Sequence, residues 1–191
     1  LQWRLSDKAT DGESLPETVR EALQSRLKRL PERTSKTLSV AAAIGSNIDI
    51  DLLQSIVGQD SDFGFFDTID DLLGREILRE TGKPRVLTFA HDLLREACLA
   101  NLSATRRQGI HQVIGESLEK QCDAGKSITD AVLAEQFLAA HSNEKAFKYL
   151  LKAGVNATNT HAYVDAISLL EKAKQIAAAN CSMPDKYLLS V

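Results

Sequence analysis

The stretch ILRETGKPRVLTF, residues 77–89, decides the fold, because it is the one convincing strand signal in 191 residues. Two short runs rich in apolar and β-branched residues, 77–81 and 85–89, flank the turn residues Gly82-Lys83-Pro84. This pattern predicts a β-hairpin. Two strands alone are only marginally stable in water, so we expect the hairpin to lie against helices.

Four helices are expected before this hairpin. The first runs from Ser14, which forms a capping box with Glu17, to Pro31, which stops it. Apolar residues at three- and four-residue steps predict the other three helices over 34–44, from Asp49 or Asp51 to 58, and over 62–75. Three helices followed by a two-stranded wing are the layout of a winged helix-turn-helix.

After the hairpin the chain is helical. The expected helices cover 91–102, 104–122, 128–141, 143–158 and 161–179. In the last two, small and large residues alternate as in a tetratricopeptide repeat (TPR), at Leu150, Ala153, Gly154, Ala157, Ala166, Leu170 and Ala173. Small residues at such positions let antiparallel helices approach closely. The predicted fold is therefore mainly α: a winged helix-turn-helix with one β-hairpin, followed by TPR-like antiparallel helical repeats.

The charge distribution argues against nucleic acid as a partner. The net charge is −3 and the isoelectric point is near 5.8, whereas a nucleic-acid-binding domain carries a basic face. NIDIDLLQSIVGQD (47–60), interpreted as the second helix of the helix-turn-helix, contains no Lys or Arg. The basic clusters are Arg20, Arg26, Lys28, Arg29 and Arg33, then Arg106 and Arg107. We interpret the first cluster as a solvated face near a helix C-terminus.

No enzyme is expected within this sequence. Gly125-Lys126-Ser127 resembles the end of a P-loop, but Lys120 occupies the position of that motif's first glycine, so an inter-helix turn is predicted. The histidines are His91, His111, His141 and His161, and their spacing suits no metal ion. No combination of nucleophile, base and orienting carboxylate stands out.

Cysteines and hydropathy bear on the compartment. Cys98, Cys122 and Cys181 are odd in number and far apart, which favours a reducing compartment and hence the cytoplasm. No segment reaches the roughly 18 apolar residues that a membrane span needs. The chain begins without Met and ends within an apolar-periodic stretch, so we expect a piece of a longer protein.

Three segments resemble a known class of proteins: LPETVREALQSRLKRLPERTSKTLSVAAAIG (15–45), FAHDLLREACLANLSATRRQGIHQVIGESLE (89–119) and AFKYLLKAGVNATNTHAYVDAISLLEKAKQI (146–176). They are similar to consecutive parts of the STAND class of signalling ATPases. This class includes the ATPase regions of LuxR-type transcription regulators, class III adenylate cyclases and large sensor kinases. The resemblance runs from about Trp3 to Ala179.

The resemblance implies an order of domains. Residues 1–33 correspond to the end of a preceding helical lid, 34–102 to the winged-helix domain and 103–191 to the helical-repeat arm. The Walker motifs, and with them ATP or ADP, belong to a nucleotide domain N-terminal to this sequence. In related apoptosis and innate-immune ATPases a winged-helix histidine contacts the β-phosphate of ADP, and His91 in Phe89-Ala90-His91 is the matching residue. Arg107 and His111 are expected to stabilise the junction between winged helix and arm.

Three functional hypotheses follow. The first is a non-catalytic regulatory segment that latches the ADP-bound state on its own nucleotide domain, with an arm that senses a protein partner or a small effector. The second is a stand-alone TPR-like scaffold that binds proteins. The third is a DNA-binding winged-helix regulator, which the acidic composition disfavours. The sequence itself predicts no bound cofactor, and it leaves open the output domain and whether the parent oligomerises on activation.

Overall fold

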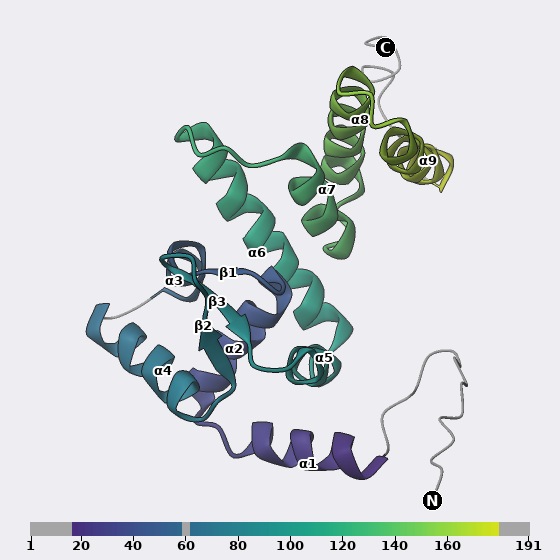
Figure 1. Cartoon of the computed structure of the whole chain (residues 1–191). Coiled ribbons are helices and arrows are strands. Elements are labelled where there is room, and N and C mark those ends of the chain that lie inside the picture. The colour runs from purple at the N-terminus through teal and green to yellow at the C-terminus, as the bar shows by residue number, and fades with distance from the viewer. Residues whose placement is uncertain (1–16, 59–61, 180–191) are drawn as a thin grey trace, which may run out of the picture.

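The computed structural model describes residues 17–58 and 62–179 (Figure 1). Across these ranges the chain is mainly helical, with one small antiparallel sheet of three strands. The predicted capping box of Ser14 and Glu17 involves a residue outside the described ranges. The helical bounds are α1 Glu17–Lys28, α2 Glu32–Ile44, α3 Ile50–Val57, α4 Asp62–Gly74, α5 Asp92–Ala100, α6 Ala104–Asp123, α7 Asp130–Ala139, α8 Asn143–Asn159 and α9 Tyr163–Ala179.

The sheet contains the predicted hairpin and a strand that was not predicted. β2 (Leu78–Glu80) and β3 (Val86–Phe89) pair antiparallel, with Leu78 opposite Phe89, which confirms the hairpin. β1 (Ile48–Asp49) pairs with the other edge of β3, so the strand order is β1-β3-β2. The prediction of a hairpin alone was therefore incomplete. A strand of two residues is too short to show an alternating pattern, so its sequence carried no signal.

The side chain of Thr81 forms hydrogen bonds across the hairpin turn. Thr81 Oγ1 donates to the main-chain oxygen of Val86 at 2.7 Å and accepts from the amide of Lys83 at 3.2 Å. The hydroxyl therefore takes part in the turn between the two strands, as Ser and Thr side chains do in short turns. Arg85 adopts a φ of 58° there, and its amide oxygen accepts from Ile50 N at 3.0 Å. The hairpin turn is thus tied to the start of α3.

Helix α2 lies at the centre of the N-terminal half. Its Ala41 and Ala42 are completely buried, and it contacts α3, α4, α5 and α6. The small side chains permit this close approach. The surrounding core consists of side chains from the helices and the sheet, and its largest fully buried members are Leu38, Ile48, Leu53, Phe65, Leu72, Ile77, Leu78 and Leu94.

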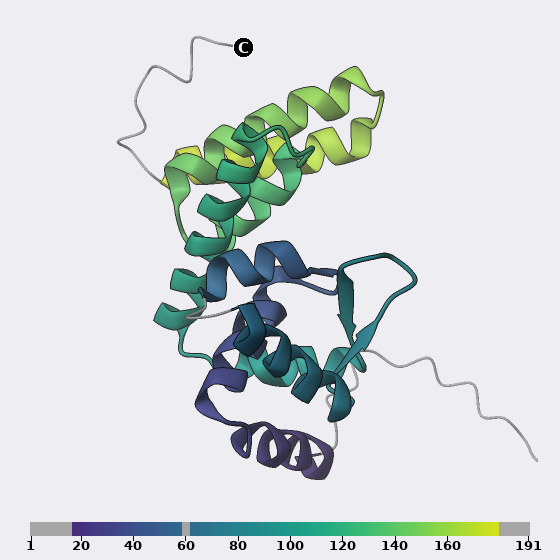
Figure 2. The ribbon, with the colours of Figure 1, turned by 90° about the vertical axis from the view of Figure 1, so that its left-hand side faces the viewer.

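The C-terminal half is a series of helices in which each packs on the next. α6 contacts α7, α7 contacts α8, and α8 contacts α9; Figure 2 shows α7–α9 gathered at one end of the molecule. Two glycines permit close packing between neighbours. A Cβ atom on Gly115 would lie 2.8 Å from the Phe137 ring, and one on Gly154 would lie 2.7 Å from Leu170.

Two turns of this series share one backbone geometry. His141 and His161 are both left-handed, with φ of 56° and 62°. In each turn the residue after the histidine donates its main-chain amide to a carbonyl in the last turn of the preceding helix. Ser142 N donates to Phe137 O, and Ala162 N donates to Ala157 O, both at 2.9 Å. This is the Schellman arrangement that ends helices. The helix ends therefore recur at a 20-residue spacing, which the alternation of small and large residues had not specified.

The two halves share a hydrophobic boundary. Ala43 of α2 and Leu52 of α3 are buried in the same cluster as Ile114 and Leu118 of α6. α6 therefore packs on α2 and α3 as well as on α7. Ser103, where the repeat arm was predicted to start, is the N-cap of α6, and its hydroxyl accepts from Arg106 N at 3.3 Å.

Candidate functional site

His91 lies where the sheet ends and α5 begins. It occupies the N-cap position of α5 with an extended backbone (φ −146°, ψ 136°), and its side chain makes no capping hydrogen bond within the described structure. Its main-chain oxygen accepts from Leu94 N at 3.0 Å. The residue is exposed, so its imidazole is accessible from solvent. A role of this side chain in capping α5 is thereby excluded in this structure.

The backbone that carries His91 is held on both sides. Ala90 N, just before it, donates to Ile77 O at 2.9 Å and thus continues the hairpin pairing. Just after it, α5 is fixed to α2 because Arg95 Nε donates to Ala42 O at 3.1 Å. Leu94 and Cys98 bury the inner side of α5. The exposed imidazole therefore projects from a firmly anchored backbone.

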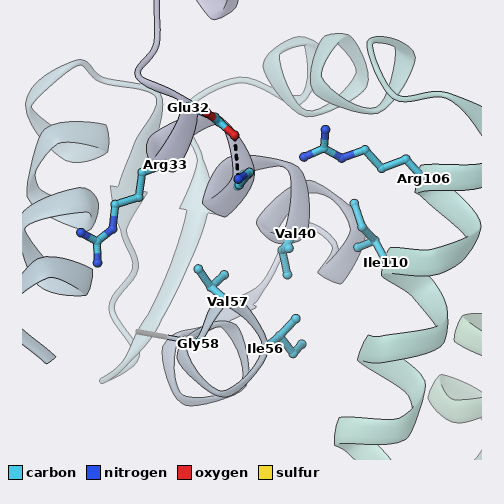
Figure 3. A pocket seen from close by; sticks show the side chains of 9 residues that line it. Glu32, Arg33, Val40, Ile56, Val57, Gly58, Arg106 and Ile110 are labelled. Carbon is cyan, nitrogen blue, oxygen red and sulfur yellow. Dashed lines mark ion pairs between the residues drawn. The ribbon is translucent and has the colours of Figure 1, made fainter. Parts of the chain in front are cut away.

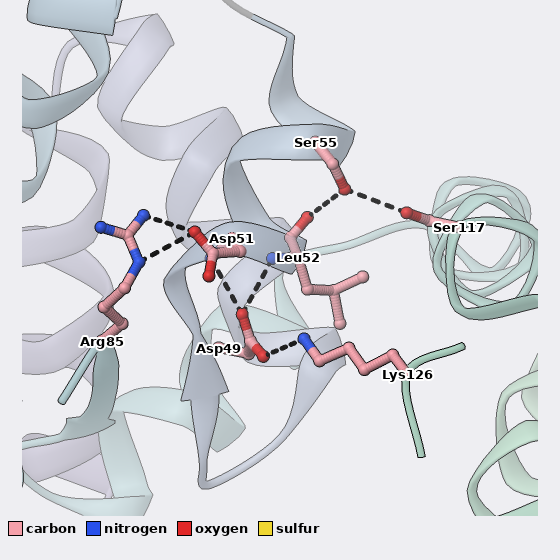
Figure 4. A network of polar contacts seen from close by, with 7 residues as sticks. All are labelled: Asp49, Asp51, Leu52, Ser55, Arg85, Ser117 and Lys126. Atoms are coloured by element: carbon pink, nitrogen blue, oxygen red, sulfur yellow. Dashed lines mark hydrogen bonds and ion pairs between the residues drawn. The ribbon is translucent and has the colours of Figure 1, made fainter. Parts of the chain in front are cut away.

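A network of charged and polar side chains joins the sheet region to the C-terminal helices (Figure 4). Asp49, the N-cap of α3, accepts through Oδ1 from the amides of Asp51 at 2.9 Å and Leu52 at 3.0 Å. Its Oδ2 atom pairs with Lys126 Nζ at 2.7 Å. Arg85 from the hairpin turn pairs with the carboxylate of Asp51. The network links β1, α3, the hairpin and the α6–α7 turn.

The pKa of the Asp49 carboxyl reflects this position. Partial burial is the largest single influence, and it raises the pKa. The hydrogen bond and charge of Lys126 and the hydrogen bonds from the Leu52 and Asp51 amides all lower the pKa, and together they outweigh burial. The resulting pKa lies below the ordinary value. Asp49 is therefore ionised at neutral pH, as both its capping role and its ion pair require.

A hydroxyl pair lies beside this network. Ser55 Oγ and Ser117 Oγ are 3.0 Å apart and join α3 to α6. Ser55 also donates to Leu52 O at 2.8 Å. Because Ser55 belongs to α3 and Ser117 to α6, this contact supplements the buried packing of Leu52 against α6.

Gly125-Lys126-Ser127 forms an inter-helix turn, as predicted. Gly125 adopts a φ of 91°, and Lys126 N donates to Gln121 O at 2.9 Å, which completes a Schellman end for α6. The Lys126 ammonium group is engaged by Asp49. A P-loop instead follows a strand, opens a helix and directs its Lys to phosphate. The residues that resemble this motif therefore serve to end α6 and join the two halves.

Two of the predicted basic residues, Arg33 and Arg106, line one hollow. It has a volume of about 560 Å³, lies between α2, α3 and α6, and is also lined by Lys36 (Figure 3). The guanidinium of Arg33 lies against Gly64 of α4. Lys36 pairs with Glu32 at 2.7 Å and thereby lowers the pKa of Glu32, through the hydrogen bond and the charge. Three basic side chains and one carboxylate therefore line this hollow.

Other basic side chains hold helix ends. Arg26 of α1 donates to the main-chain oxygen of Arg75 after α4, and Arg107 Nη2 donates to Leu99 O of α5 at 3.0 Å. Arg107 therefore links α5 to α6, in line with the role expected for it at the junction. The side chain of Arg20 lies outside the described part.

His111 forms a hydrogen bond with a residue of α7. Its Nδ1 atom lies 2.8 Å from Oε1 of Gln136, and Gln136 is itself buried in α7. The contact joins α6 to α7, so both partners belong to the predicted arm. The expected role of His111 at the junction with the winged helix stays a prediction, because its one described hydrogen bond lies within the arm.

The cysteines and the grouping of acidic, His and Cys side chains bear on catalytic and metal chemistry. Burial raises the pKa of the Cys98 thiol to about 12, so this thiol is protonated and a weak nucleophile at neutral pH. Cys122 is exposed, and Cys181 lies outside the described ranges. Within residues 17–58 and 62–179, no group of three or more His, Cys, Asp or Glu side chains is arranged to hold a metal ion. The described helices include none with the length and apolar character to cross a bilayer.

Sequence reasoning named His91 as a candidate and Arg107 as a junction residue, but it missed the network around Asp49. Its members come from positions 49, 51, 85 and 126, and each pair is a contact between distant parts of the chain. The one local signal is Asp49 as the N-cap of α3, because the predicted start of this helix was Asp49 or Asp51. Comparisons of the chain with protein-family models, with curated proteins and with solved structures gave no significant match.

Proposed function

We propose that the chain is the non-catalytic regulatory part of a STAND-type signalling ATPase. In this proposal residues 34–102 form a winged helix that latches the ADP-bound state, and the helices from 103 onward form an arm that responds to a protein partner or a small effector. The observation that carries the proposal is the exposed His91, projecting from an anchored backbone at the end of the sheet. ATP and ADP belong to the nucleotide domain of the parent protein, and a cytoplasmic location is part of the same proposal.

The order of the elements supports the winged-helix assignment. A winged helix consists of a helix, a short strand, two helices and two further strands. The order α2, β1, α3, α4, β2, β3 agrees with that layout, and so does the sheet order β1-β3-β2. The short strand β1 is thus the element that the sequence prediction lacked.

In this assignment the second helix of the helix-turn-helix is α4, and not the segment 47–60 that the sequence suggested. α4 has the sequence DFGFFDTIDDLLG, which contains four Asp and neither Lys nor Arg. A helix that enters the major groove meets phosphate on both sides, and this favours basic side chains. Assigning α4 as the second helix of the helix-turn-helix therefore does not favour the alternative of a DNA-binding regulator.

The chemistry of His91 suits a latch. An imidazole N–H can donate to a phosphate oxygen that a neighbouring domain presents. A hydrogen bond to a charged group contributes roughly 1.5–3 kcal/mol, which is enough to bias a two-state hinge. Because the side chain is not used to cap α5, forming such a bond would not disrupt the helix start.

The contacts between the halves suit a lever. Movement of the arm is transmitted to the sheet if the two are joined by both buried packing and polar contacts. Leu52 supplies the buried packing against α6, while Asp49–Lys126 and Ser55–Ser117 supply the polar contacts. These contacts bridge α3 and the region from α6 to the α6–α7 turn.

The test is His91→Ala in the full-length protein, with His141→Ala as a matched control in an exposed turn of the arm. Loss of roughly 1.5–3 kcal/mol corresponds to ADP release about 10- to 150-fold faster. We expect faster ADP release and a raised basal output for His91→Ala alone. Wild-type ADP retention together with wild-type output in His91→Ala would falsify the latch.

A second candidate function is a protein-binding scaffold, favoured by the outer face of α9. Tyr163, Val164 and Ile167 are 57%, 82% and 59% exposed. Ile167 lies four positions after Tyr163 and three after Val164, so the three side chains share one side of the helix. Exposed apolar patches of this kind mark contact surfaces. A parent reading frame without a Walker A motif upstream of Leu1 would favour this scaffold over the ATPase.

A further inference from the structure

The hollow of about 560 Å³ at the junction of the two halves has an aliphatic surface (Figure 3). The aliphatic part of its lining is half-buried and consists of Val40 from α2, Ile56 and Val57 from α3, and Ile110 from α6. Small-molecule sites are concave, have volumes of this order, and combine a mostly apolar lining with a few polar groups. The hollow therefore offers a surface on which the apolar body of a ligand can pack.

The charged part of the lining is mainly basic. Arg33 places its guanidinium against Gly64 of α4, so the cations at the mouth are Lys36 and Arg106. The one carboxylate of the lining, that of Glu32, pairs with Lys36 at 2.7 Å, and both side chains are well exposed. Two cations against one carboxylate leave the mouth with one positive charge in excess, which favours an anionic ligand.

No structural role within the described chain accounts for the guanidinium of Arg106. The main-chain amide of this residue donates to Ser103 Oγ, but its exposed side chain forms no hydrogen bond or ion pair with any described residue. Arg106 lies in the first turn of α6, where the helix dipole disfavours a cation. Figure 3 shows its side chain extending toward Glu32, and its charge adds to the hydrogen bond and charge of Lys36 in lowering the pKa of Glu32. A guanidinium with its donors unused therefore faces the hollow.

We propose that this hollow binds a small apolar molecule with one anionic head group, a carboxylate or a phosphate. The head group accepts hydrogen bonds from Arg106, whose planar fork of donors matches both groups, and from Lys36, which has donors to spare beyond its pair with Glu32. The apolar body packs against the aliphatic lining that includes Val40 and Ile56. Because the lining comes from α2, α3 and α6, occupancy stabilises the contact between the two halves. Binding requires only this packing and does not rest on the proposed nucleotide latch.

The test is isothermal titration of the purified chain with octanoate and with octyl phosphate, which share the apolar body and differ in the head group. We expect saturable binding of at least one of them, and the tighter ligand identifies the head group. Octylammonium carries the opposite charge on the same body and acetate lacks the body, so each should bind at least tenfold more weakly. Affinity should rise from butanoate to octanoate by up to about fourfold for each CH₂ group. Absence of saturable binding by both anions overturns the proposal, and so does equal binding of octylammonium.

The substitution Arg106→Gln tests the contact with the head group. We expect the affinity to fall at least tenfold, because a hydrogen bond to a charged group contributes roughly tenfold or more. The melting temperature without ligand should stay unchanged or rise, since a cation leaves the first turn of α6. Lys120→Gln makes the same change of charge in the last turn of α6, outside the lining, and should bind as the wild type does. Wild-type affinity in Arg106→Gln overturns the proposed contact, and equal losses in both variants overturn it as a general effect of net charge.

Discussion

The Nζ atom of Lys126 lies 2.7 Å from the Oδ2 atom of Asp49, a residue 77 positions earlier in the chain. The other oxygen of the same carboxylate accepts from the amides of Asp51 and Leu52. One side chain therefore starts α3 and also holds the α6–α7 turn against it. Because the two roles use different oxygens, substitutions can separate them.

The substitution Asp49→Ala removes both the N-cap and the ion pair with Lys126, whereas Asp49→Asn keeps the N-cap and removes only the ion pair. Loss of an N-cap costs about 1 kcal/mol, whereas a half-exposed ion pair contributes at most about 1 kcal/mol and often less. We expect Asp49→Ala to lower the free energy of unfolding by about 1–2 kcal/mol, and Asp49→Asn by less than half of that. Urea denaturation followed by circular dichroism measures both. Lys126→Ala is the control for the ion pair alone and should resemble Asp49→Asn.

The same carboxylate predicts a pH dependence. Its pKa in the folded state is below the ordinary value of 3.8, so the folded state favours the ionised form. The stabilisation is therefore fully present above the ordinary pKa and is lost as the pH falls through the lower folded-state pKa. Urea titrations from pH 6 to strongly acidic pH should show a smaller loss of stability in Asp49→Asn than in the wild type. Parallel curves for the two proteins would contradict this assignment.

Two glycines of α6 should respond to alanine in opposite ways. A Cβ atom on Gly115 would meet the completely buried ring of Phe137 at 2.8 Å, and that ring stacks on Tyr149 and cannot move freely. Overpacking of this kind costs about 1–3 kcal/mol. Gly109 has no atom within 4 Å of its Cβ position, so alanine there gains helix propensity of about 1 kcal/mol at most.

The measurement is the urea midpoint of Gly115→Ala and Gly109→Ala against the wild type. We expect a lower midpoint for the first variant and a higher one for the second. Because both residues lie in the same helix, a general effect of helix propensity would raise both midpoints. Equal shifts would show that α6 and α7 do not approach as closely as the Gly115–Phe137 contact implies.

Local patterns were sufficient to predict the helices and the hairpin. The apolar spacing in α3 and α4 and the Gly82-Lys83-Pro84 turn are local signals, and the structure has these elements within a few residues of the predicted bounds. β1 is different, because Ile48 and Asp49 become a strand only by pairing with Leu87 and Val86. The position of α6 against α2 and α3 also depends on contacts between distant residues, among them Leu52 with its cluster.

The candidate sites likewise differ in whether a local sequence pattern or contacts between distant residues define them. His91 is a candidate because it matches, in Phe89-Ala90-His91, a histidine of the class that the chain resembles. The network at the junction requires Asp49 and Lys126 to meet, and no spacing in the sequence brings a residue of β1 and one of the α6–α7 turn together. Lys126 was noticed for its resemblance to a P-loop. Its actual role as a partner of Asp49 depends on how α6 ends and where that end lies.

Glycine at either left-handed histidine should stabilise the protein. His141 and His161 have positive φ, which costs an L-residue with a bulky side chain roughly 1 kcal/mol relative to glycine. We expect His141→Gly to raise the free energy of unfolding by up to about 1 kcal/mol, and His141→Ala to give no such gain. His161→Gly should gain less, because His161 Nδ1 contacts Tyr163 Oη at 2.9 Å and this contact is lost. Urea denaturation of the three variants tests the order.

Cysteine reactivity should report whether α5 stays attached to the sheet. The pKa of Cys98 is raised to about 12 by burial, so almost none of this thiol is ionised at pH 8, whereas Cys122 is exposed on α6. In a Cys181→Ser background we expect iodoacetamide to modify Cys122 quickly and Cys98 only at the rate at which α5 detaches or the protein unfolds. Peptide mass spectrometry measures the two sites separately. His91 precedes α5 directly, so modification of Cys98 well before global unfolding would show that the backbone beneath His91 is not firmly anchored.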